Sequence, residues 1–309
     1  MEKVLVIILG QARAHRLTWE SFQKNVLHEL QADLALCVGT SLENNPENPF
    51  WENALYKWVC PEWEDFGDGF DDLQKKRYGS TREWREILTV KNQWLGGIKG
   101  QESHPGSAGI LIYFRAVLYD ALNSEGLLGK YDRFIITRSD FVWALPHPDL
   151  SQMNPENFWV PYGEFYYGIT DRHAVLSRQF VKPYLDLIEP ILRHPEKLKE
   201  RMLKSNPKQN WNLEQYILFS MREAGLQKKL KYFPYIMYSV RDENTQSRWS
   251  MGEFDSSLGY YVKYSHEKTR SELSARFFTD RNGKVKMFNN FWMRIALKIL
   301  FSLRVRGWI

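Results

Sequence analysis

A short apolar run that ends abruptly in charged residues is the feature that most constrains the fold. Residues 131–140 have the sequence YDRFIITRSD, in which Phe134–Ile136 lead directly into Thr137–Asp140. The apolar run predicts a buried parallel strand, and its polar end indicates that the strand reaches the rim of a sheet. Open α/β sheets bind ligands at the carboxyl ends of their strands. We therefore expect Arg138 and Asp140 to lie where a bound anion or metal would be met, although many such Asp residues only cap a turn.

The amino-terminal segment predicts the first strands of the same sheet. Val4–Leu9 and Leu34–Val38 are apolar runs, and a helix is expected between them from Thr18, as its cap, to about residue 30. The loop after the first run, GQAR at positions 10–13, lacks the three-glycine fingerprint of dinucleotide-binding proteins. We expect the first half of a nucleotide-binding sheet, without NAD, FAD or a phosphate loop of the ATPase type.

The remaining chain gives a coarser pattern. Apolar residues recur at helical spacing from Ala108 to Leu122, and within this helix we expect Arg115 to form a surface salt bridge. Residues 62–77 indicate a solvated helix, with a lid over an acceptor as the alternative. Residues 231–240 are expected to form one strand, and residues 242–276, rich in Ser and Tyr, an irregular segment.

Composition limits the class of protein. The 309 residues suffice for one large domain or two modest ones, and 42 basic against 37 acidic residues give a net charge of +5. This excess is too small and too dispersed to indicate a nucleic-acid partner. Cys37 and Cys60 lie on apolar segments without metal-ligand spacing, which is typical of reduced core residues in a cytosolic protein. Neither a signal peptide nor a membrane-spanning run is evident, so a soluble or peripheral cytoplasmic protein is expected.

The carboxyl-terminal tail has its own pattern. Residues 284–309 contain no acidic residue and six basic ones, interleaved with large apolar residues such as Phe288 and Trp308. A basic helix with an apolar side matches an interfacial membrane anchor. Packing of this helix against the rest of the protein is the alternative.

Together, several segments resemble one enzyme family. They are the first strand with its GQAR loop, the YDRFIITRSD strand, an aromatic segment with two glycines at 162–168 before Thr-Asp-Arg, and a helix that opens with Asn-x-Glu at 212–214. Over roughly residues 1–241 this order resembles GT-A-type nucleotide-sugar glycosyltransferases, like those of bacterial surface-polysaccharide loci and large algal viruses. The resemblance implies an α/β fold, with a GT-A-like Rossmann-type mixed sheet flanked by helices over residues 1–280. Residues 281–309 would be a basic helical extension.

The resemblance also implies a donor site. TRSD looks like a variant of the family's Asp-x-Asp metal motif, with Arg138 in place of the first carboxylate. Asp140 would then bind Mn²⁺ or Mg²⁺, with His266 as a late ligand or else simply solvated. Arg138 would contact the diphosphate, or form a salt bridge that orients Asp140. The residues expected to bind the nucleotide sugar, UDP-linked by preference, are Gly10, Gln11, Arg13, Arg138, Ser139 and Asp140.

A transfer to a hydroxyl needs a base, and a carboxylate usually provides it. Asp171 is the candidate that the resemblance implies, although it could instead cap a helix through residue 176. Glu214 is the competing base, or a first-turn acid that favours the helix dipole. The residues expected to bind the acceptor are Tyr166, Tyr167 and His173.

The predicted function is metal-assisted transfer of a hexose or pentose to a hydroxyl of a glycan or lipid-linked glycan, with inversion preferred. Two alternatives remain. One is an inactive carbohydrate-binding protein of the same fold, which the missing first carboxylate of the motif favours. The other is a nucleotidyltransferase, which would release pyrophosphate.

Overall fold

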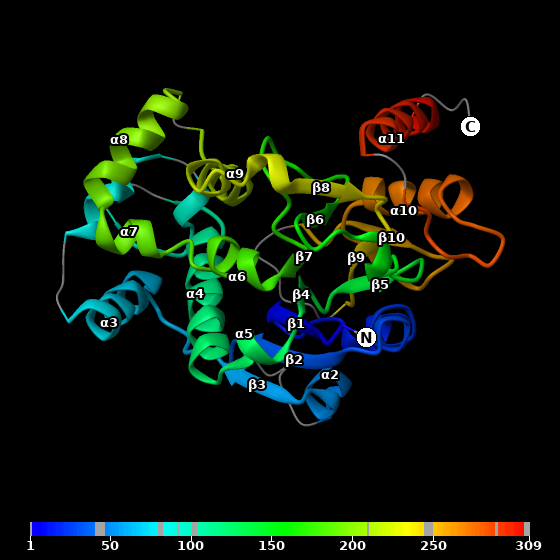
Figure 1. The fold of residues 1–309 in the computed structure, drawn as a ribbon, viewed down its shortest axis with the longest axis horizontal. Coiled ribbons are helices and arrows are strands. Elements are labelled where there is room, and N and C mark those ends of the chain that lie inside the picture. The colour runs from blue at the N-terminus through cyan, green and yellow to red at the C-terminus, as the bar shows by residue number, and fades with distance from the viewer. Residues whose placement is uncertain are drawn as a thin grey trace.

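Two β-sheets form the centre of the protein. The computed structural model describes residues 2–40, 47–79, 83–91, 93–100, 104–208, 210–243, 250–287 and 290–305. A seven-stranded sheet has the order β3-β2-β1-β4-β7-β6-β8, and a four-stranded sheet has the order β10-β11-β9-β5 (Figure 1). In the large sheet β7 runs antiparallel to both of its neighbours, and the other pairs are parallel. This architecture confirms the predicted class, a Rossmann-type mixed sheet flanked by helices, and is consistent with a GT-A-like fold.

The strands are β1 (Val4–Gly10), β2 (Asp33–Val38), β3 (Tyr56–Val59), β4 (Arg133–Thr137), β5 (Phe141–Trp143), β6 (Phe158–Pro161), β7 (Ala174–Ser177), β8 (Leu230–Phe233), β9 (Met237–Arg241), β10 (Glu253–Asp255) and β11 (Tyr260–Val262). The α-helices are α1 (His15–Phe22), α2 (Pro49–Asn53), α3 (Phe66–Tyr78), α4 (Ala108–Ser124), α5 (Leu127–Lys130), α6 (Arg178–Leu185), α7 (Glu189–Arg193), α8 (Pro195–Ser205), α9 (Leu213–Glu223), α10 (Ser265–Phe277) and α11 (Asn290–Val305). Shorter turns are the π-helix at 23–28 and 3₁₀ turns at 84–89, 93–95, 150–152 and 227–229.

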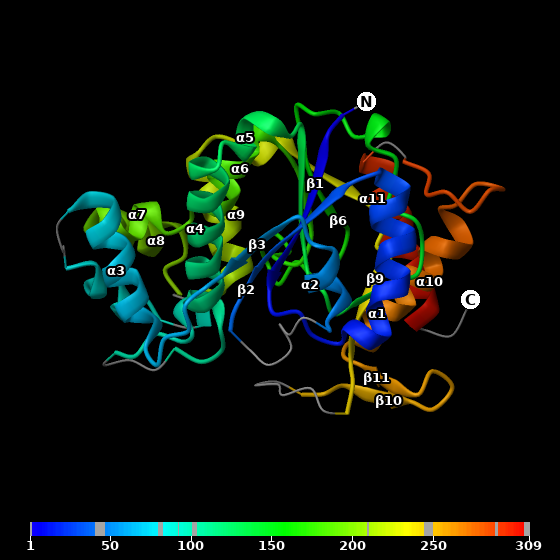
Figure 2. The same cartoon turned by 90° about the horizontal axis from the view of Figure 1, so that it is seen from below.

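The large sheet is buried on both faces, which explains why its central strands are continuous apolar runs. Leu5, Ile7 and Leu9 of β1 pack into the cluster that contains α4, α6 and α9, whereas Val4, Val6 and Ile8 pack toward α1 and the small sheet. Figure 2 shows these layers, with α4, α6 and α9 on one side of the sheet and α1 on the other. Because successive side chains of a strand point to opposite faces of the sheet, the apolar residues of β1 contribute alternately to the two hydrophobic cores.

The segment after α9 departs from the prediction. The single strand expected at 231–240 is wrong, because Pro234 interrupts the hydrogen-bonding ladder and separates β8, in the large sheet, from β9, in the small one. The irregular segment expected at 242–276 is also wrong, since its described part forms β10, β11 and α10. The small sheet thus pairs β5 with β9, two strands that lie more than ninety residues apart in the chain.

Local helix signals were only partly correct. The helix after β1 begins at His15 rather than Thr18, and the Thr18 hydroxyl donates to the Ala14 carbonyl within the helix instead of capping it. The helix predicted at residues 62–77 exists as α3, with Asp65 as its cap. It is amphipathic rather than fully solvated, because Phe70 and Leu73 are buried.

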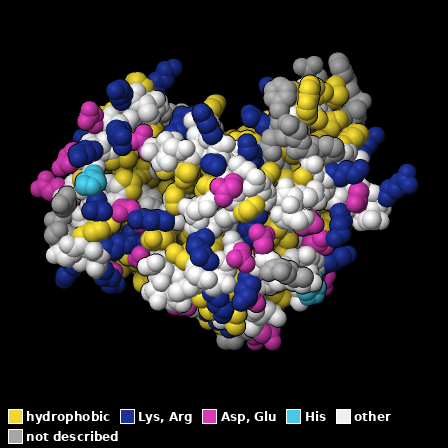
Figure 3. All heavy atoms as spheres, viewed as in Figure 1, with side chains coloured by type: hydrophobic (Ala, Val, Ile, Leu, Met, Phe, Trp, Pro, Cys, Tyr) yellow, Lys and Arg dark blue, Asp and Glu magenta, His cyan; other side chains and the backbone are white. Residues whose placement is uncertain are grey.

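Helix α11 packs one face against the protein. Met293 and Leu297 are buried next to Phe278, and α11 contacts α10 and β8. Figure 3 shows hydrophobic side chains on the outer surface at this position, and basic side chains interspersed with acidic ones over the face in view. The helices among the described residues are all too short or too polar to cross a bilayer. Phe288 and Trp308 of the predicted anchor lie outside the described residues, and the domain boundary at residue 280 stays a prediction.

Candidate active site

A cavity of about 530 Å³ opens at the carboxyl ends of β1 and β4. Its walls come from the loops after these two strands, the start of α4, the start of α9, and the ends of β9 and β11. Six Lys and Arg side chains line it together with four Asp and Glu. The strand-end location is the one predicted for Arg138 and Asp140, and both residues line the cavity.

The loop after β1 is fastened to the loop after β4. Gly10 ends β1 with φ +118°, a backbone conformation that favours glycine, and a side chain added there would meet nothing within 4 Å. The Ser139 hydroxyl lies 2.8 Å from the carbonyl oxygen of Gln11 and 3.0 Å from that of Arg13. Ser139 is buried and lies outside the cavity wall, unlike Gly10, Gln11 and Arg13. A nucleotide contact predicted for Ser139 is therefore replaced by a role in positioning this loop.

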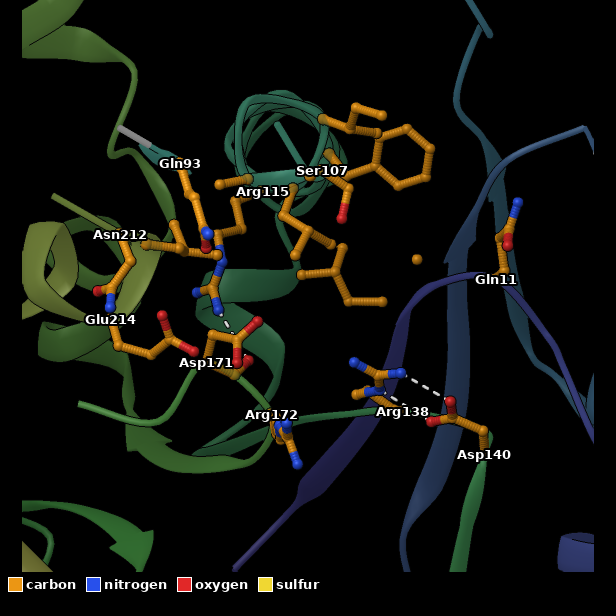
Figure 4. A pocket seen from close by; sticks show the side chains of 18 of the residues that line it. Gln11, Gln93, Ser107, Arg115, Arg138, Asp140, Asp171, Arg172, Asn212 and Glu214 are labelled. Atoms are coloured by element: carbon orange, nitrogen blue, oxygen red, sulfur yellow. Dashed lines mark hydrogen bonds and ion pairs between the residues drawn. The ribbon is translucent and has the colours of Figure 1, made fainter. Parts of the chain in front are cut away.

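Asp140 is enclosed by arginines. Arg138 donates from Nε to Oδ1 at 2.8 Å and from Nη2 to Oδ2 at 2.6 Å, while Arg241 Nη1 donates to Oδ2 (Figure 4 shows the Arg138 pair). Burial alone would raise the pKa of Asp140, but the two guanidinium groups outweigh it and hold the pKa well below its usual range. The same carboxylate raises the pKa of Arg138 against the opposing effect of burial. Asp140 is therefore an anion at neutral pH and is paired with two cations.

The small sheet brings Arg241 and Lys263 to this place, and the sequence did not mark either as a site residue. Asp140 immediately precedes β5, which pairs with β9, and the Val240 amide donates to the Asp140 carbonyl at 2.9 Å. Lys263 immediately follows β11, which pairs with the other edge of β9. Only the aromatic and β-branched run Tyr260–Val262 could have suggested a strand here.

The residues predicted to hold a divalent metal do not fit one. Both carboxylate oxygens of Asp140 accept from guanidinium groups, and the neighbouring charges are positive. His266 Nε2 lies 2.8 Å from Glu164 Oε1, and neither residue lines the cavity. Within the described part of the chain, no group of three or more His, Cys, Asp or Glu side chains could hold a metal ion.

Two carboxyl groups lie on the other side of the cavity. Figure 4 shows Asp171 beside Glu214, across from the pair Arg138 and Asp140. Burial raises the pKa of Glu214 to about 8, and the charge of Asp171 acts in the same direction. At neutral pH the Glu214 carboxyl is therefore mostly protonated. This differs from the ordinary first-turn acid of a helix, which is ionised and favoured by the dipole.

The backbone holds this pair in place. The Ile169 amide donates to the Glu214 carbonyl at 3.0 Å, and a Cβ on Gly168 would come within 2.0 Å of Glu214 backbone atoms. Arg115 is buried, and its Nη2 donates to the Asp171 carbonyl at 2.9 Å, so the predicted surface salt bridge is wrong. Asp171 does not cap a helix either, since residues 174–177 form β7.

The acceptor residues predicted from the sequence are separated by the fold. Tyr166 lines the cavity, and its hydroxyl donates to Glu164 at 3.0 Å. Tyr167 is 87% exposed and is not part of the cavity wall. His173 is 0% exposed and packs against Trp143 and Phe233, with ring centroids 5.4 and 5.6 Å away. Burial in this aromatic cluster leaves His173 no surface for an acceptor, so that prediction is corrected.

Comparison with known proteins adds little to this geometry. No protein-family model matches the chain, and no curated protein matches its sequence. Mouse xyloside xylosyltransferase 1, solved in its apo form, is a similar structure: it is 9% identical, with coverage of 76% of this chain and 85% of that chain and a TM-score of 0.41. A structural similarity with this identity and TM-score does not assign an activity to the chain.

Proposed function

We propose that this protein is a glycosyltransferase that moves a sugar from a nucleoside diphosphate sugar to a hydroxyl of a glycan acceptor. The observation that carries the proposal is the division of one cavity into two chemical halves. Arg138, Arg241 and Lys263 gather around Asp140 in one half. The carboxyl pair Asp171 and Glu214 lies in the other half, with Arg115 beside it. Sugar transfer needs both halves, because a diphosphate leaves while a hydroxyl loses its proton.

The cationic half suits the donor. The guanidinium of Arg138 can bind diphosphate oxygens in a bidentate manner, and Arg13 lines the same wall. Gln11 and the backbone of Gly10 would contact the base and ribose of the donor, for which UDP is the favoured nucleotide. The volume of about 530 Å³ lies within the range of sites that bind small molecules.

The carboxyl half suits the hydroxyl of the acceptor. In the step we propose, the acceptor oxygen forms a bond to C1 of the sugar as the bond from C1 to the diphosphate breaks. The bonding electron pair leaves with the diphosphate, and the hydroxyl proton goes to Asp171. Glu214, protonated at neutral pH, donates a hydrogen bond to the substrate or to Asp171. A base on the side opposite to the diphosphate fits a single displacement with inversion.

Tyr166 is the aromatic side chain proposed to contact the acceptor. It lines the cavity near Asn212, whose side-chain amide donates to the Tyr166 carbonyl at 3.0 Å. An aromatic ring offers a flat apolar face with a polar tip, which is suited to a sugar ring. The ring lies 5.8 Å from the guanidinium of Arg172, so its orientation is held.

The experiment is a turnover assay with a panel of UDP-, GDP-, CDP- and TDP-sugars and oligosaccharide acceptors. Release of nucleoside diphosphate that depends on the acceptor is the expected result. Asp171→Asn should retain donor binding and lose turnover by about 10²-fold or more. Asp68→Asn on α3, a side chain that is 63% exposed, is the matched control and should keep full activity.

The other outcomes separate the alternative functions. Release of pyrophosphate would identify a nucleotidyltransferase. Glycan binding without any nucleotide binding or turnover would identify an inactive carbohydrate-binding protein. Full turnover in Asp171→Asn would remove Asp171 as the base and leave Glu214 to be tested in the same way.

We also propose that α11 touches an anionic membrane surface, where a lipid-linked acceptor would be found. Its outer face carries Trp292, 66% exposed, and Ile299, 52% exposed, seven residues apart and so on one side of the helix. Each basic residue near such a surface contributes about 1 kcal/mol. The exposed basic residues of α11 are Arg294, Lys298 and Arg304.

Cosedimentation with vesicles tests this contact. Binding to vesicles that contain phosphatidylserine, but not to purely zwitterionic ones, is expected. The double replacement of Trp292 and Ile299 by Ser should weaken it. Phe254→Ser on β10, which removes an equally exposed aromatic residue, is the control. Equal sedimentation of the wild type with both kinds of vesicle, or with neither, would contradict the proposal.

A further inference from the structure

The cations near Asp140 outnumber the carboxylates that face them. Asp140 is shared by Arg138 and Arg241, and Lys263 lines the same wall of the cavity. Among the described residues, Lys263 Nζ has no carboxylate within ion-pair distance, and it lies 4.9 Å from the centroid of the Tyr264 ring. One buried anion therefore faces three basic side chains.

Two donors of these arginines are left without a partner. Arg138 uses Nε and Nη2 on Asp140, so its Nη1 makes no hydrogen bond to the described residues. The Nε of Arg241 is buried and has no hydrogen-bond partner in the described part of the chain. A buried polar group without a partner, as Arg241 Nε is, is uncommon and calls for an explanation. Arg138 Nη1 belongs to a side chain that is 27% exposed and lines the cavity. An anion with several acceptor oxygens would satisfy these groups.

The state of Lys263 gives independent support. Burial lowers its pKa to about 6, and repulsion from Arg138 and then Arg241 adds to this, outweighing the attraction of Asp140. Lys263 therefore forms no ion pair with the described residues, and its surroundings disfavour the protonated form of its amine. A bound polyanion would reverse that effect.

We propose that the cavity binds the diphosphate of its donor directly through Arg138, Arg241 and Lys263, with no divalent cation between the protein and the phosphates. This inference rests on the proposed function and deepens it. In a metal-assisted transferase, a divalent ion supplies the positive charge that stabilises the leaving diphosphate. Here preorganised side chains supply it, since Asp140 is fully engaged in orienting them.

The test measures binding rather than turnover. Titration calorimetry of the wild type with UDP, GDP, CDP and TDP is carried out in excess EDTA, and again with Mn²⁺ and with Mg²⁺. At least one nucleoside diphosphate should bind with the same affinity, within about twofold, in EDTA and in metal. The corresponding monophosphate should bind more weakly, because it lacks half of the phosphate contacts.

Lys263→Met gives a decisive variant. It keeps the length of the side chain and removes an amine whose charge is opposed by burial and by the neighbouring arginines, so the free protein should be at least as stable as the wild type. Affinity for the diphosphate should nevertheless fall by roughly 10- to 100-fold, the loss expected for one hydrogen bond between charged groups. Lys231→Met on β8, outside the cavity and also half-buried, is the matched control and should bind like the wild type.

The outcomes are separable. Diphosphate binding that appears only with Mn²⁺ or Mg²⁺ would overturn this inference and leave the proposed function standing. Unchanged affinity in a folded Lys263→Met protein would remove Lys263 from the site and overturn it as stated. If none of the four nucleotides binds with or without metal, the proposed function fails, and the inference fails with it.

Discussion

Replacement of Glu214 by Gln tests the carboxyl pair through stability, without any knowledge of the substrate. Glu214 lies in the first turn of α9, half-buried and beside Asp171. Gln has nearly the same shape and no charge. The replacement therefore isolates the energetic cost of ionising Glu214 in the folded protein.

The magnitude follows from the two pKa values. The carboxyl titrates near 4.5 in an unpaired state and at about 8 in the fold. Between these values the folded protein retains a proton that the unfolded chain has released, so the stability of the wild type falls as the pH rises, by about 1.4 kcal/mol per pH unit. Over the whole interval the loss amounts to about 5 kcal/mol. The Gln variant does not undergo this loss.

Urea denaturation of both proteins at intervals between about pH 5 and about pH 9 measures the effect. The two proteins should have similar free energies of unfolding at the acidic end. Toward pH 8 the Gln variant should become more stable than the wild type, by a difference that approaches about 5 kcal/mol. All other titrating groups are common to both proteins and cancel in the difference.

Two controls define the result. Glu200→Gln on the exposed side of α8 should show a difference that does not change with pH. In an Asp171→Asn background, the effect of Glu214→Gln should be smaller, because one of its two main causes is absent. A flat difference between wild type and Glu214→Gln across the pH range would refute the assignment of a protonated Glu214 at neutral pH.

Three further predictions concern the scaffold. Asp140→Asn should lower the free energy of unfolding at pH 7 by about 3–5 kcal/mol in urea denaturation, because two guanidinium groups lose their carboxylate; the difference should shrink in acid, as the wild-type carboxylate becomes protonated. Gly168→Ala should lower the same quantity by about 1–3 kcal/mol or more, since the added methyl would lie 2.0 Å from backbone atoms of α9, whereas Gly129→Ala, with nothing within 4 Å, should not. Cys37 and Cys60 are buried with their sulfurs 3.5 Å apart, and burial together with this contact raises the pKa of Cys37. Both thiols should react with a thiol reagent only at the rate of unfolding, and fast labelling in the native protein would contradict this burial.

The large sheet could be predicted because its signal is local. A strand buried on both faces must be apolar at every position, and β1, β2 and β4 therefore stand out in the sequence as short apolar runs. Arg138 and Asp140 were placed at the rim for the same reason. The polarity changes at the residue where the sheet ends.

The rest of the site depends on contacts that no local pattern encodes. Arg241 and Asp140 are 101 residues apart, and only the pairing of β5 with β9 brings them together. Short strands with polar residues, such as β10 and β11, resemble loops until their partners are known. The prediction for His173 was wrong for a different reason. Its polar and charged neighbours in the sequence suggested an exposed side chain, but His173 directly precedes β7 and is buried in an aromatic cluster.

Asp140 shows that the position of a motif can be predicted from the sequence while its partner depends on the rest of the fold. A carboxylate at the end of a central strand binds whichever cation the fold brings to it, and the strand itself does not determine whether that cation is a metal ion or an arginine. Here β9 delivers Arg241, and the residue two positions before Asp140 is itself an arginine, so both carboxylate oxygens are engaged within the chain. In our proposal, the positive charge that the sequence assigned to a metal is supplied by Arg138, after β4, and by Arg241 and Lys263 of the second sheet. For this reason the metal dependence of nucleotide binding, rather than the mutation of Asp140, is the measurement that distinguishes the two designs.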